Sequence, residues 1–508
     1  MKLEREKNAK RNIVAGSALK VTALLLPFVL RTVIIQYIGV EYAGVNTLFS
    51  SLLNVLSLAE LGFGTAIVYS MYKPIANNET EKICSLLNYY KNCYRIIGSI
   101  VLVVGIILLP FIPHLIDGDI PDGLNIYLVY SIYLVNTSIS YFMFAYKSSV
   151  LIALQRNDIS SWISLIVTFL KYGLQIFLIV LLRNYYWFLL VLPLTSIINN
   201  ICIEIVTRKK YPQYYPSGII DKQNKENINK KVKSLFIYKV GNVVSNSADS
   251  IVISSFLGLS TLAIYGNYYF VISSLFGFLA IYYDSIRAGL GNKIALESND
   301  SVFSLFKELF FLQGVLIGWM TICLLCLYQD FITVWLHNER LMLSWEMVIL
   351  LCLYFYSWAI NDIVSIFKEA AGLWEYDRFR PLLASLSNLI INIVLVNTIG
   401  LYGVVISTIV CELTFSLLWG VRVLFTKYFT GKYKYYLGRL ALYTFVNILV
   451  GAITYFVCDR ILMDSIYLSF VVKILICCML PTGLFICIYY RSNLFRSSIS
   501  RIKRIIIK

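Results

Sequence analysis

The chain has 508 residues, of which 59% are hydrophobic and 14% are charged, and its mean hydropathy is +0.74. Soluble domains average about 25% Asp, Glu, Lys and Arg, so these figures exclude a water-soluble protein, and the hydrophobic content excludes intrinsic disorder. The 44 Lys and Arg outnumber the 28 Asp and Glu, for a net charge of +16. In so apolar a chain, this excess indicates membrane orientation rather than nucleic-acid binding.

Apolar runs long enough to cross a bilayer recur along the whole chain. A transmembrane helix needs about 20 mostly apolar residues. About fourteen such runs lie between turn signals: Ile13–Ile38, Asn46–Met71, Ile96–Pro113, Leu124–Tyr146, Ile159–Leu182, Trp187–Thr207, Leu235–Leu257, Leu262–Ile286, Val302–Tyr328, Trp345–Phe367, Leu382–Thr398, Tyr402–Val421, Tyr443–Cys458 and Ile466–Tyr490. The sequence therefore predicts an all-α integral membrane protein with about 14 transmembrane helices.

The basic residues between these runs alternate in number along the chain. If the N-terminus is cytoplasmic, the inner segments carry 36 of the 44 Lys and Arg, whereas the outer segments hold only Arg183, Arg340 and Arg460. Cytoplasmic loops are the ones enriched in Lys and Arg. We therefore expect a multi-pass protein of the cell membrane with both termini in the cytoplasm.

The chain also matches itself at an offset of 219 residues. Lys20 falls on Lys239, Gly39 on Gly258, and further matches continue without a gap. This predicts five regions: a six-helix bundle (1–207), a basic cytoplasmic linker (208–234), a second six-helix bundle (235–425), two additional helices (426–490) and a basic cytoplasmic tail (491–508). Two parallel repeats of this kind are typical of transporters that alternate access to a site between the repeats.

Charged side chains inside the predicted spans are the candidate site residues. A charge in hydrocarbon costs at least about 2.5–3.5 kcal/mol, so it should face a cavity or a partner. The candidates for lining a basic, substrate-binding cavity are Lys20, Arg31, Lys171, Lys239, Asn242 and Asn246. The acids that could bind a coupling H⁺ or Na⁺, or pair with these bases, are Glu60, Asp249 and Asp284. For the uncharged polar residues, hydrogen bonding between helices is an equally good interpretation.

Four basic residues at inner helix ends, Lys147, Arg287, Lys368 and Arg422, are interpreted as orientation signals. Lys473, near the outer end of its helix, is expected to extend toward the membrane surface.

No P-loop or nucleophile elbow is present, and the two histidines are far apart in sequence, so we expect neither an enzyme nor a metal site nor a cofactor. Cys323-x-x-Cys326 lacks a second pair, and the 11 cysteines are expected to be free thiols.

One block carries a family resemblance. Residues 35–76 read IQYIGVEYAGVNTLFSSLLNVLSLAELGFGTAIVYSMYKPIA. The Ile-Gly turn followed by Tyr-Ala-Gly, the Ala-Glu-Leu-Gly element and the Tyr-Lys-Pro end resemble the Wzx-type polysaccharide flippases. These form the O-antigen and repeat-unit flippases of the polysaccharide transporter family, within the multidrug/oligosaccharidyl-lipid/polysaccharide exporter superfamily. The order of features resembles this family along essentially the whole chain.

The resemblance implies a V-shaped pair of six-helix bundles in the bacterial plasma membrane. It also implies a substrate, an undecaprenyl-pyrophosphate-linked oligosaccharide that is moved from the cytoplasmic to the outer leaflet during synthesis of O-antigen lipopolysaccharide or capsule. The partners implied are this lipid-linked oligosaccharide, membrane lipids and other polysaccharide-assembly membrane proteins. Two alternatives stay open: a cation-coupled drug or metabolite exporter of the same superfamily, and a membrane polysaccharide polymerase or ligase.

Overall fold

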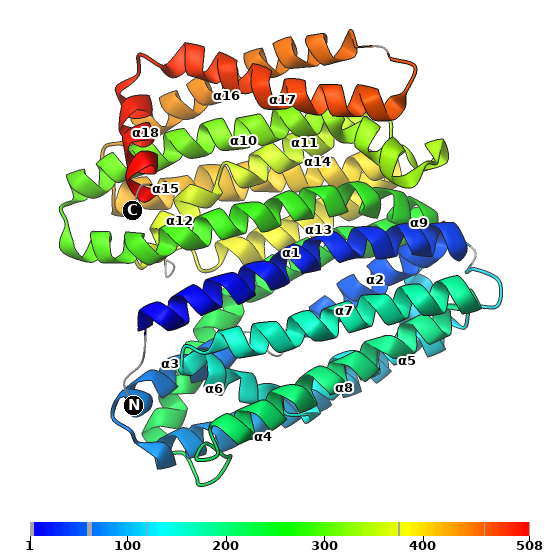
Figure 1. The fold of residues 1–508 in the computed structure, drawn as a ribbon, viewed down its shortest axis with the longest axis vertical. Coiled ribbons are helices and arrows are strands. Elements are labelled where there is room, and N and C mark those ends of the chain that lie inside the picture. Colours follow the sequence, from blue (N-terminus) through cyan, green and yellow to red (C-terminus); the bar gives the residue numbers. More distant parts are fainter. Residues whose placement is uncertain (1–4, 58–62, 119, 374–375, 462, 507–508) are drawn as a thin grey trace. The chain divides into compact units, whose positions relative to one another are not determined.

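The computed structural model describes residues 5–57, 63–118, 120–373, 376–461 and 463–506, which are mostly α-helical (Figure 1). The predicted all-α class is therefore confirmed. The chain divides into two compact units, Met1–Gly266 and Asn267–Lys508. Because this division falls inside one long helix, the domain boundaries expected from the repeat stay predictions.

Twelve of the predicted spans have a counterpart in the structure. Eleven helices in the described part of the chain are long and apolar enough to cross a membrane, and a bent pair, Ile126–Phe142 and Ala145–Ala153, makes a twelfth if it is counted as one span. The protein is thus a multi-pass membrane protein. The predicted run 46–71 continues through residues 58–62, which lie outside the described residues, and the run 235–257 forms part of a longer helix. The number fourteen therefore stays a prediction.

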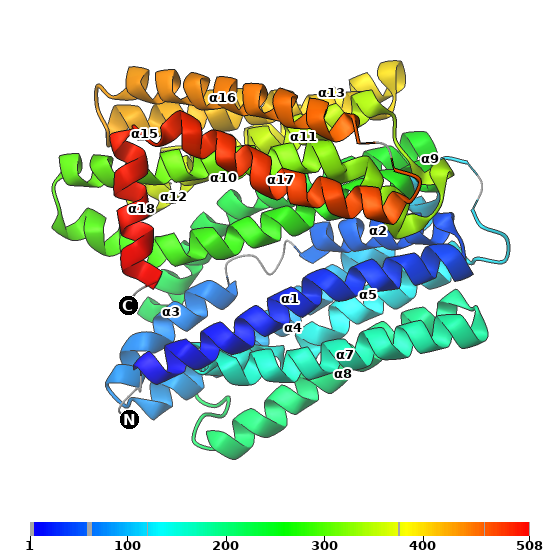
Figure 2. The same ribbon diagram turned by 45° about the horizontal axis from the view of Figure 1, so that its top comes forward.

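The first unit begins with a long helix and continues as a bundle. Its helices are α1 (Arg5–Tyr37), α2 (Val40–Leu56), α3 (Phe63–Ala76), α4 (Thr80–Leu108), α5 (Ile126–Phe142), α6 (Ser148–Ala153), α7 (Asn157–Leu182) and α8 (Tyr185–Lys210). α1 packs along α7, and α5 packs against both α4 and α8 (Figures 1 and 2). The Tyr130 hydroxyl on α5 donates to the Gly105 carbonyl on α4 at 3.0 Å. A buried phenol is thereby satisfied in the core of the bundle.

The helix α9 (Lys222–Leu296) begins at a capping aspartate and is broken once. Asp221 accepts the backbone N–H of Asn224 at 2.7 Å, and this hydrogen bond lowers the pKa of Asp221. Farther along, Gly258 has φ 80° and ψ 173°. Gly39, its equivalent at the offset of 219, separates α1 from α2 with φ 142° and ψ 162°. Positive φ is easy only for glycine, which explains why both predicted turns carry it.

The second unit is likewise a helical bundle. Its helices are α10 (Asn299–Leu336), α11 (Trp345–Ala359), α12 (Asp362–Ala370), α13 (Arg380–Ile399), α14 (Leu401–Cys411), α15 (Val421–Lys427), α16 (Tyr433–Asp459), α17 (Ile466–Tyr489) and α18 (Asn493–Ile506). α10 packs against α11, α16 and α17, and α13 forms a hairpin with α14 (Figure 1). The buried Asn447 on α16 donates to the Gly314 carbonyl on α10 at 3.1 Å. This bond holds the first of the two predicted additional helices to the bundle.

Candidate functional site

Arg31 is the predicted site residue whose surroundings are best defined. Its guanidinium donates to the Thr47 hydroxyl on α2 at 3.3 Å and to the Ala263 carbonyl on α9 at 3.0 Å. Thr47 in turn donates to the Ala43 carbonyl at 2.9 Å, which orients its oxygen. A Cβ atom at Gly266 would lie 2.7 Å from the guanidinium, so a larger residue there would displace the Arg31 side chain. A single charged group thus joins α1, α2 and α9.

The same region brings α2 against the backbone of α9. A Cβ atom at Gly44 would lie 2.2 Å from the Leu259 carbonyl oxygen, so the two helices touch backbone to backbone. Ser260 donates to the Glu41 carboxylate at 3.0 Å. Residue 31 and residues 41–47 belong to the predicted first repeat, whereas residues 259–263 belong to the second. The Arg31 junction, defined as Arg31, Glu41, Gly44 and their partners on α9, therefore joins the two predicted repeats.

Of the other cavity candidates, Lys20 and Lys171 have described side chains, whereas the three on α9 do not. Lys20 lies exposed on α1, about three turns before Arg31. Lys171 lies half-buried on α7, the helix along which α1 packs, with its ammonium 4.3 Å from the centre of the Tyr172 ring. The side chains of Lys239, Asn242 and Asn246 lie outside the described residues, although their backbone belongs to α9. α1 and α7 thus carry the three basic candidates that the structure describes.

The two acidic candidates that the structure describes, Asp249 and Asp284, differ in exposure. Asp249 is 8% exposed within α9. Asp284, at the other end of this helix, is exposed and pairs with Arg287 at 2.9 Å. Glu60 lies outside the described residues. Charge pairing is therefore observed for Asp284, and an ion-coupling role for any of the three stays a prediction.

Several uncharged polar residues of the predicted stripes bond between helices. The Tyr133 hydroxyl on α5 donates to the Asn46 side chain on α2 at 2.5 Å. Ser196 on α8 donates to Asn136 on α5 at 2.8 Å, and Ser164 on α7 donates to Asn199 on α8 at 3.1 Å. For these residues the structure supports the interpretation as interhelical hydrogen bonds.

The interpretation of Lys147 and Lys368 as simple orientation signals needs correction. Lys147 is 2% exposed, and its ammonium lies 3.4 Å from the Glu204 carboxylate. Lys368 is 4% exposed and donates to Asp377, which Arg380 also contacts at 3.0 Å. These networks could not be predicted from the sequence because the partners come from other helices and turns. The repeat carries a partial signal, since Asp377 aligns with the buried Asp158, which Arg156 contacts at 2.9 Å.

Lys473 has an acidic partner that the sequence did not indicate. Its ammonium lies 2.6 Å from the Asp330 carboxylate on α10, so it pairs with an acid of the second unit. Its extension toward the membrane surface stays a prediction. The charged side chain is thereby compensated inside a predicted span, as burial of a charge requires.

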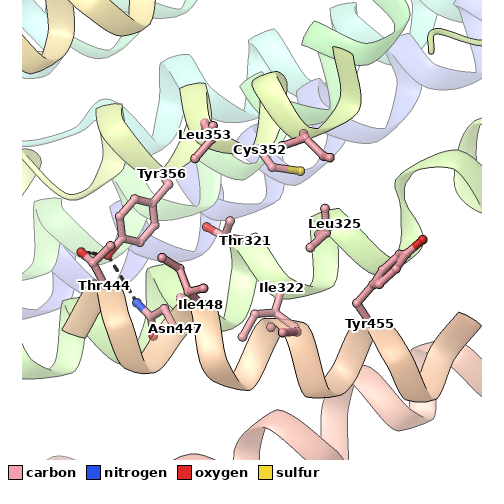
Figure 3. A pocket seen from close by; sticks show the side chains of 14 residues that line it. Thr321, Ile322, Leu325, Cys352, Leu353, Tyr356, Thr444, Asn447, Ile448 and Tyr455 are labelled. Atoms are coloured by element: carbon pink, nitrogen blue, oxygen red, sulfur yellow. Dashed lines mark hydrogen bonds between the residues drawn. The ribbon is translucent and has the colours of Figure 1, made fainter. Parts of the chain in front are cut away.

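An apolar pocket lies between α10, α11 and α16 of the second unit. Its volume is about 310 Å³. Tyr356, Thr444 and Asn447 form a hydrogen-bonded group at one end, with Tyr455 at the other (Figure 3). Between these ends the wall is largely aliphatic, including Ile322 and Leu325 (Figure 3). Such a lining suits a hydrocarbon chain better than a sugar.

Comparison with solved structures shows the same fold in known transporters. The lipid II flippase MurJ, in an inward closed conformation, matches with a TM-score of 0.65 and 14% identity over 94% of this chain and 99% of that one. An inward-facing multidrug resistance MATE family transporter of the MOP superfamily matches at 0.61 and 13% identity, over 79% and 94%. A point mutant of the Vibrio cholerae MATE transporter VcmN matches at 0.56 and 14% identity, over 84% and 99%.

Sequence comparison assigns the family. No match is found among curated protein sequences. A family model described as "Polysaccharide biosynthesis protein" matches residues 9–285, which is more than half of the chain. This segment includes the Arg31 junction and all of the first unit from residue 9. The chain belongs to the polysaccharide biosynthesis protein family, and its fold is similar to that of the lipid II flippase MurJ and of MATE family transporters.

Proposed function

We propose that the protein is a Wzx-type flippase that moves an undecaprenyl-pyrophosphate-linked oligosaccharide from the cytoplasmic to the outer leaflet of the bacterial plasma membrane. The observation that carries this proposal is the family match over residues 9–285 in a chain with the fold of a lipid flippase. Both termini would be cytoplasmic, as the distribution of basic residues predicts.

The chemistry of the substrate agrees with the basic candidates. A pyrophosphate bearing sugars carries negative charge that hydrocarbon cannot solvate, so fixed cations must replace its water. Lys20, Lys171 and Arg31 lie on neighbouring helices of the first unit and are the residues proposed to supply that charge. The apolar pocket between α10, α11 and α16 offers a surface for hydrocarbon in the second unit.

Alternating access gives the Arg31 junction a role in this proposal. Arg31 and Gly44 contact residues that belong to the other predicted repeat. Rocking of one repeat against the other would form these contacts in one state and break them in the other. Breaking them would release the Arg31 guanidinium from α9 to bind the pyrophosphate.

The experiment is gene deletion followed by location of lipid-linked oligosaccharide in the membrane. We expect the intermediate to accumulate on the cytoplasmic leaflet and surface polysaccharide to be lost. Complementation with the native chain should restore both, whereas complementation with Lys20→Glu should not. A deletion strain with normal surface polysaccharide and normal leaflet distribution would contradict the proposal.

A second candidate is a cation-coupled exporter of drugs or metabolites, which the similarity to MATE transporters favours. Such a protein would bind cations through acidic groups in its cavity, whereas the charged candidates on α1 and α7 are basic. Increased drug sensitivity of the deletion strain, with intact surface glycans, would support this candidate instead.

A further inference from the structure

Three cysteines from three helices of the second unit come together in one place. The sulfur atoms of Cys326 on α10, Cys458 on α16 and Cys477 on α17 all lie within 4.8 Å of one another. The Cys458 and Cys477 sulfur atoms are 3.9 Å apart. Cys477 is 0% exposed, Cys458 2% and Cys326 9%, so the cluster is shielded from solvent. We propose that these three thiols bind one Cu(I) ion.

The packing of α17 on α10 holds two of the three sulfur atoms in position. The Trp319 indole donates to the Cys477 carbonyl at 2.9 Å, which fixes the helices at the depth of the cluster. One turn away on each helix, Lys473 pairs with Asp330 at 2.6 Å. One contact is made at Cys477 itself and the other lies one turn away, so the helices cannot slide past one another without breaking them. The site is therefore preorganised by its surroundings.

The choice of metal follows from the type and number of ligands. Thiolates are soft ligands that select Cu(I), zinc or iron–sulfur clusters. Zinc prefers four tetrahedral ligands, but among the described residues the cluster contains three sulfur atoms and no His, Asp or Glu. With metal–sulfur bonds of about 2.3 Å, planar three-coordination places the sulfur atoms about 4.0 Å apart. The Cys458–Cys477 separation of 3.9 Å needs little adjustment to reach this geometry.

Binding has two consequences that can be measured. Thiols must lose protons to bind the metal, so the affinity for Cu(I) should rise with pH. The ion would also connect α16 and α17 to α10, and it would therefore stabilise the folded chain by mass action. Neither consequence depends on whether the protein moves a lipid-linked oligosaccharide.

The test uses the full chain, purified in detergent without oxygen. In one variant the other eight cysteines become serine, so that only the cluster remains. Cu(I) is titrated against a chromogenic Cu(I) chelator while thiolate-to-copper absorption is recorded. We expect one tightly bound Cu(I) per chain and a higher unfolding temperature with Cu(I) than without it. Because loss of an outer-shell partner already costs about 10–100-fold in metal affinity, Cys477→Ser should cost at least about 100-fold.

Single substitutions in the native chain keep the test decisive if the eight-serine variant does not fold. Cys326→Ser, Cys458→Ser and Cys477→Ser should each lose the site, whereas Cys84→Ser, a buried cysteine of the first unit, should keep it. Unchanged Cu(I) binding in the three cluster variants would overturn the proposal. So would binding of zinc without binding of Cu(I), or a Cys458–Cys477 disulfide in the purified native chain.

Discussion

The Arg31 guanidinium donates to the Ala263 carbonyl oxygen, 232 residues farther along the chain, at 3.0 Å. Arg31 lies in the predicted first repeat and Ala263 in the predicted second repeat, and both belong to the compact unit Met1–Gly266. The same side chain is the predicted substrate-binding residue with the most clearly defined partners. We therefore expect its substitution to lower stability and, under the proposed function, to impair transport.

Replacement of Arg31 by alanine should lower the free energy of unfolding by about 1.5–3 kcal/mol, the usual contribution of a hydrogen bond to a charged group. It should also abolish surface polysaccharide. Arg31→Lys keeps the charge but cannot reproduce the two-pronged contact with Thr47 and Ala263, so we expect partial function. Chemical unfolding of the purified protein and polysaccharide assays in a complemented deletion strain measure the two effects. Arg422→Ala, at an exposed position, is the control.

Gly44→Ala tests the backbone contact between α2 and α9. The added Cβ would lie 2.2 Å from the Leu259 carbonyl oxygen, and backbone cannot rotate away as a side chain can. Overpacking of this kind costs about 1–3 kcal/mol. The matched control is Gly173→Ala in the middle of α7, where no atom lies within 4 Å of the new Cβ. Alanine there should stabilise the helix by up to about 1 kcal/mol. Equal free energies of unfolding for Gly44→Ala and Gly173→Ala would show that α2 and α9 do not touch at Gly44.

Charge reversal at Lys20 tests the basic lining directly. Lys20→Glu should abolish surface polysaccharide while the protein still reaches the membrane, and Lys239→Glu should do the same because the two lysines align in the repeat. Lys20→Arg should retain function, since it preserves the charge. Lys82→Glu, at an exposed lysine on α4, serves as the control. A normal amount of surface polysaccharide in both charge-reversal variants would show that Lys20 and Lys239 do not bind the substrate.

Asp377→Ala should strongly destabilise the second unit. It would leave Lys368 and Arg380 without their shared carboxylate in a buried site, and loss of one partner of a buried pair costs about 3–5 kcal/mol. Asp300→Ala removes an exposed partner of Lys432 and should have no measurable effect. Thermal unfolding in detergent compares the two variants. A similar unfolding temperature for both variants would show that the ion pairs of Asp377 with Lys368 and Arg380 contribute little to stability.

Much of the fold could be predicted because its signals are local. Apolar length identified the spans, and the repeated glycine turn at Gly39 and Gly258 follows from the rule that positive φ favours glycine. The expectation that the basic candidates on α1 and α7 line a cavity, which follows from their cost in hydrocarbon, stays a prediction.

The partners of these residues could not be predicted, because they are distant in the sequence. Ala263 receives the Arg31 hydrogen bond through its carbonyl, a group that every residue has and that leaves no signal in sequence. Glu204 and Asp330 reach Lys147 and Lys473 from other helices, which is why these lysines were interpreted as orientation and surface residues. The cysteine cluster likewise combines residues from three separate helices, so no short sequence motif could predict it.

The activity proposed for this protein is the movement of a lipid-linked oligosaccharide across the membrane. The most direct measurement is the leaflet on which this intermediate accumulates when the gene is deleted, determined by accessibility to a sugar-modifying reagent that cannot cross the membrane. We predict that the intermediate becomes inaccessible from outside and that the native chain, but not Lys20→Glu, restores access. Accumulation on the outer leaflet in the deletion strain would contradict the proposed activity.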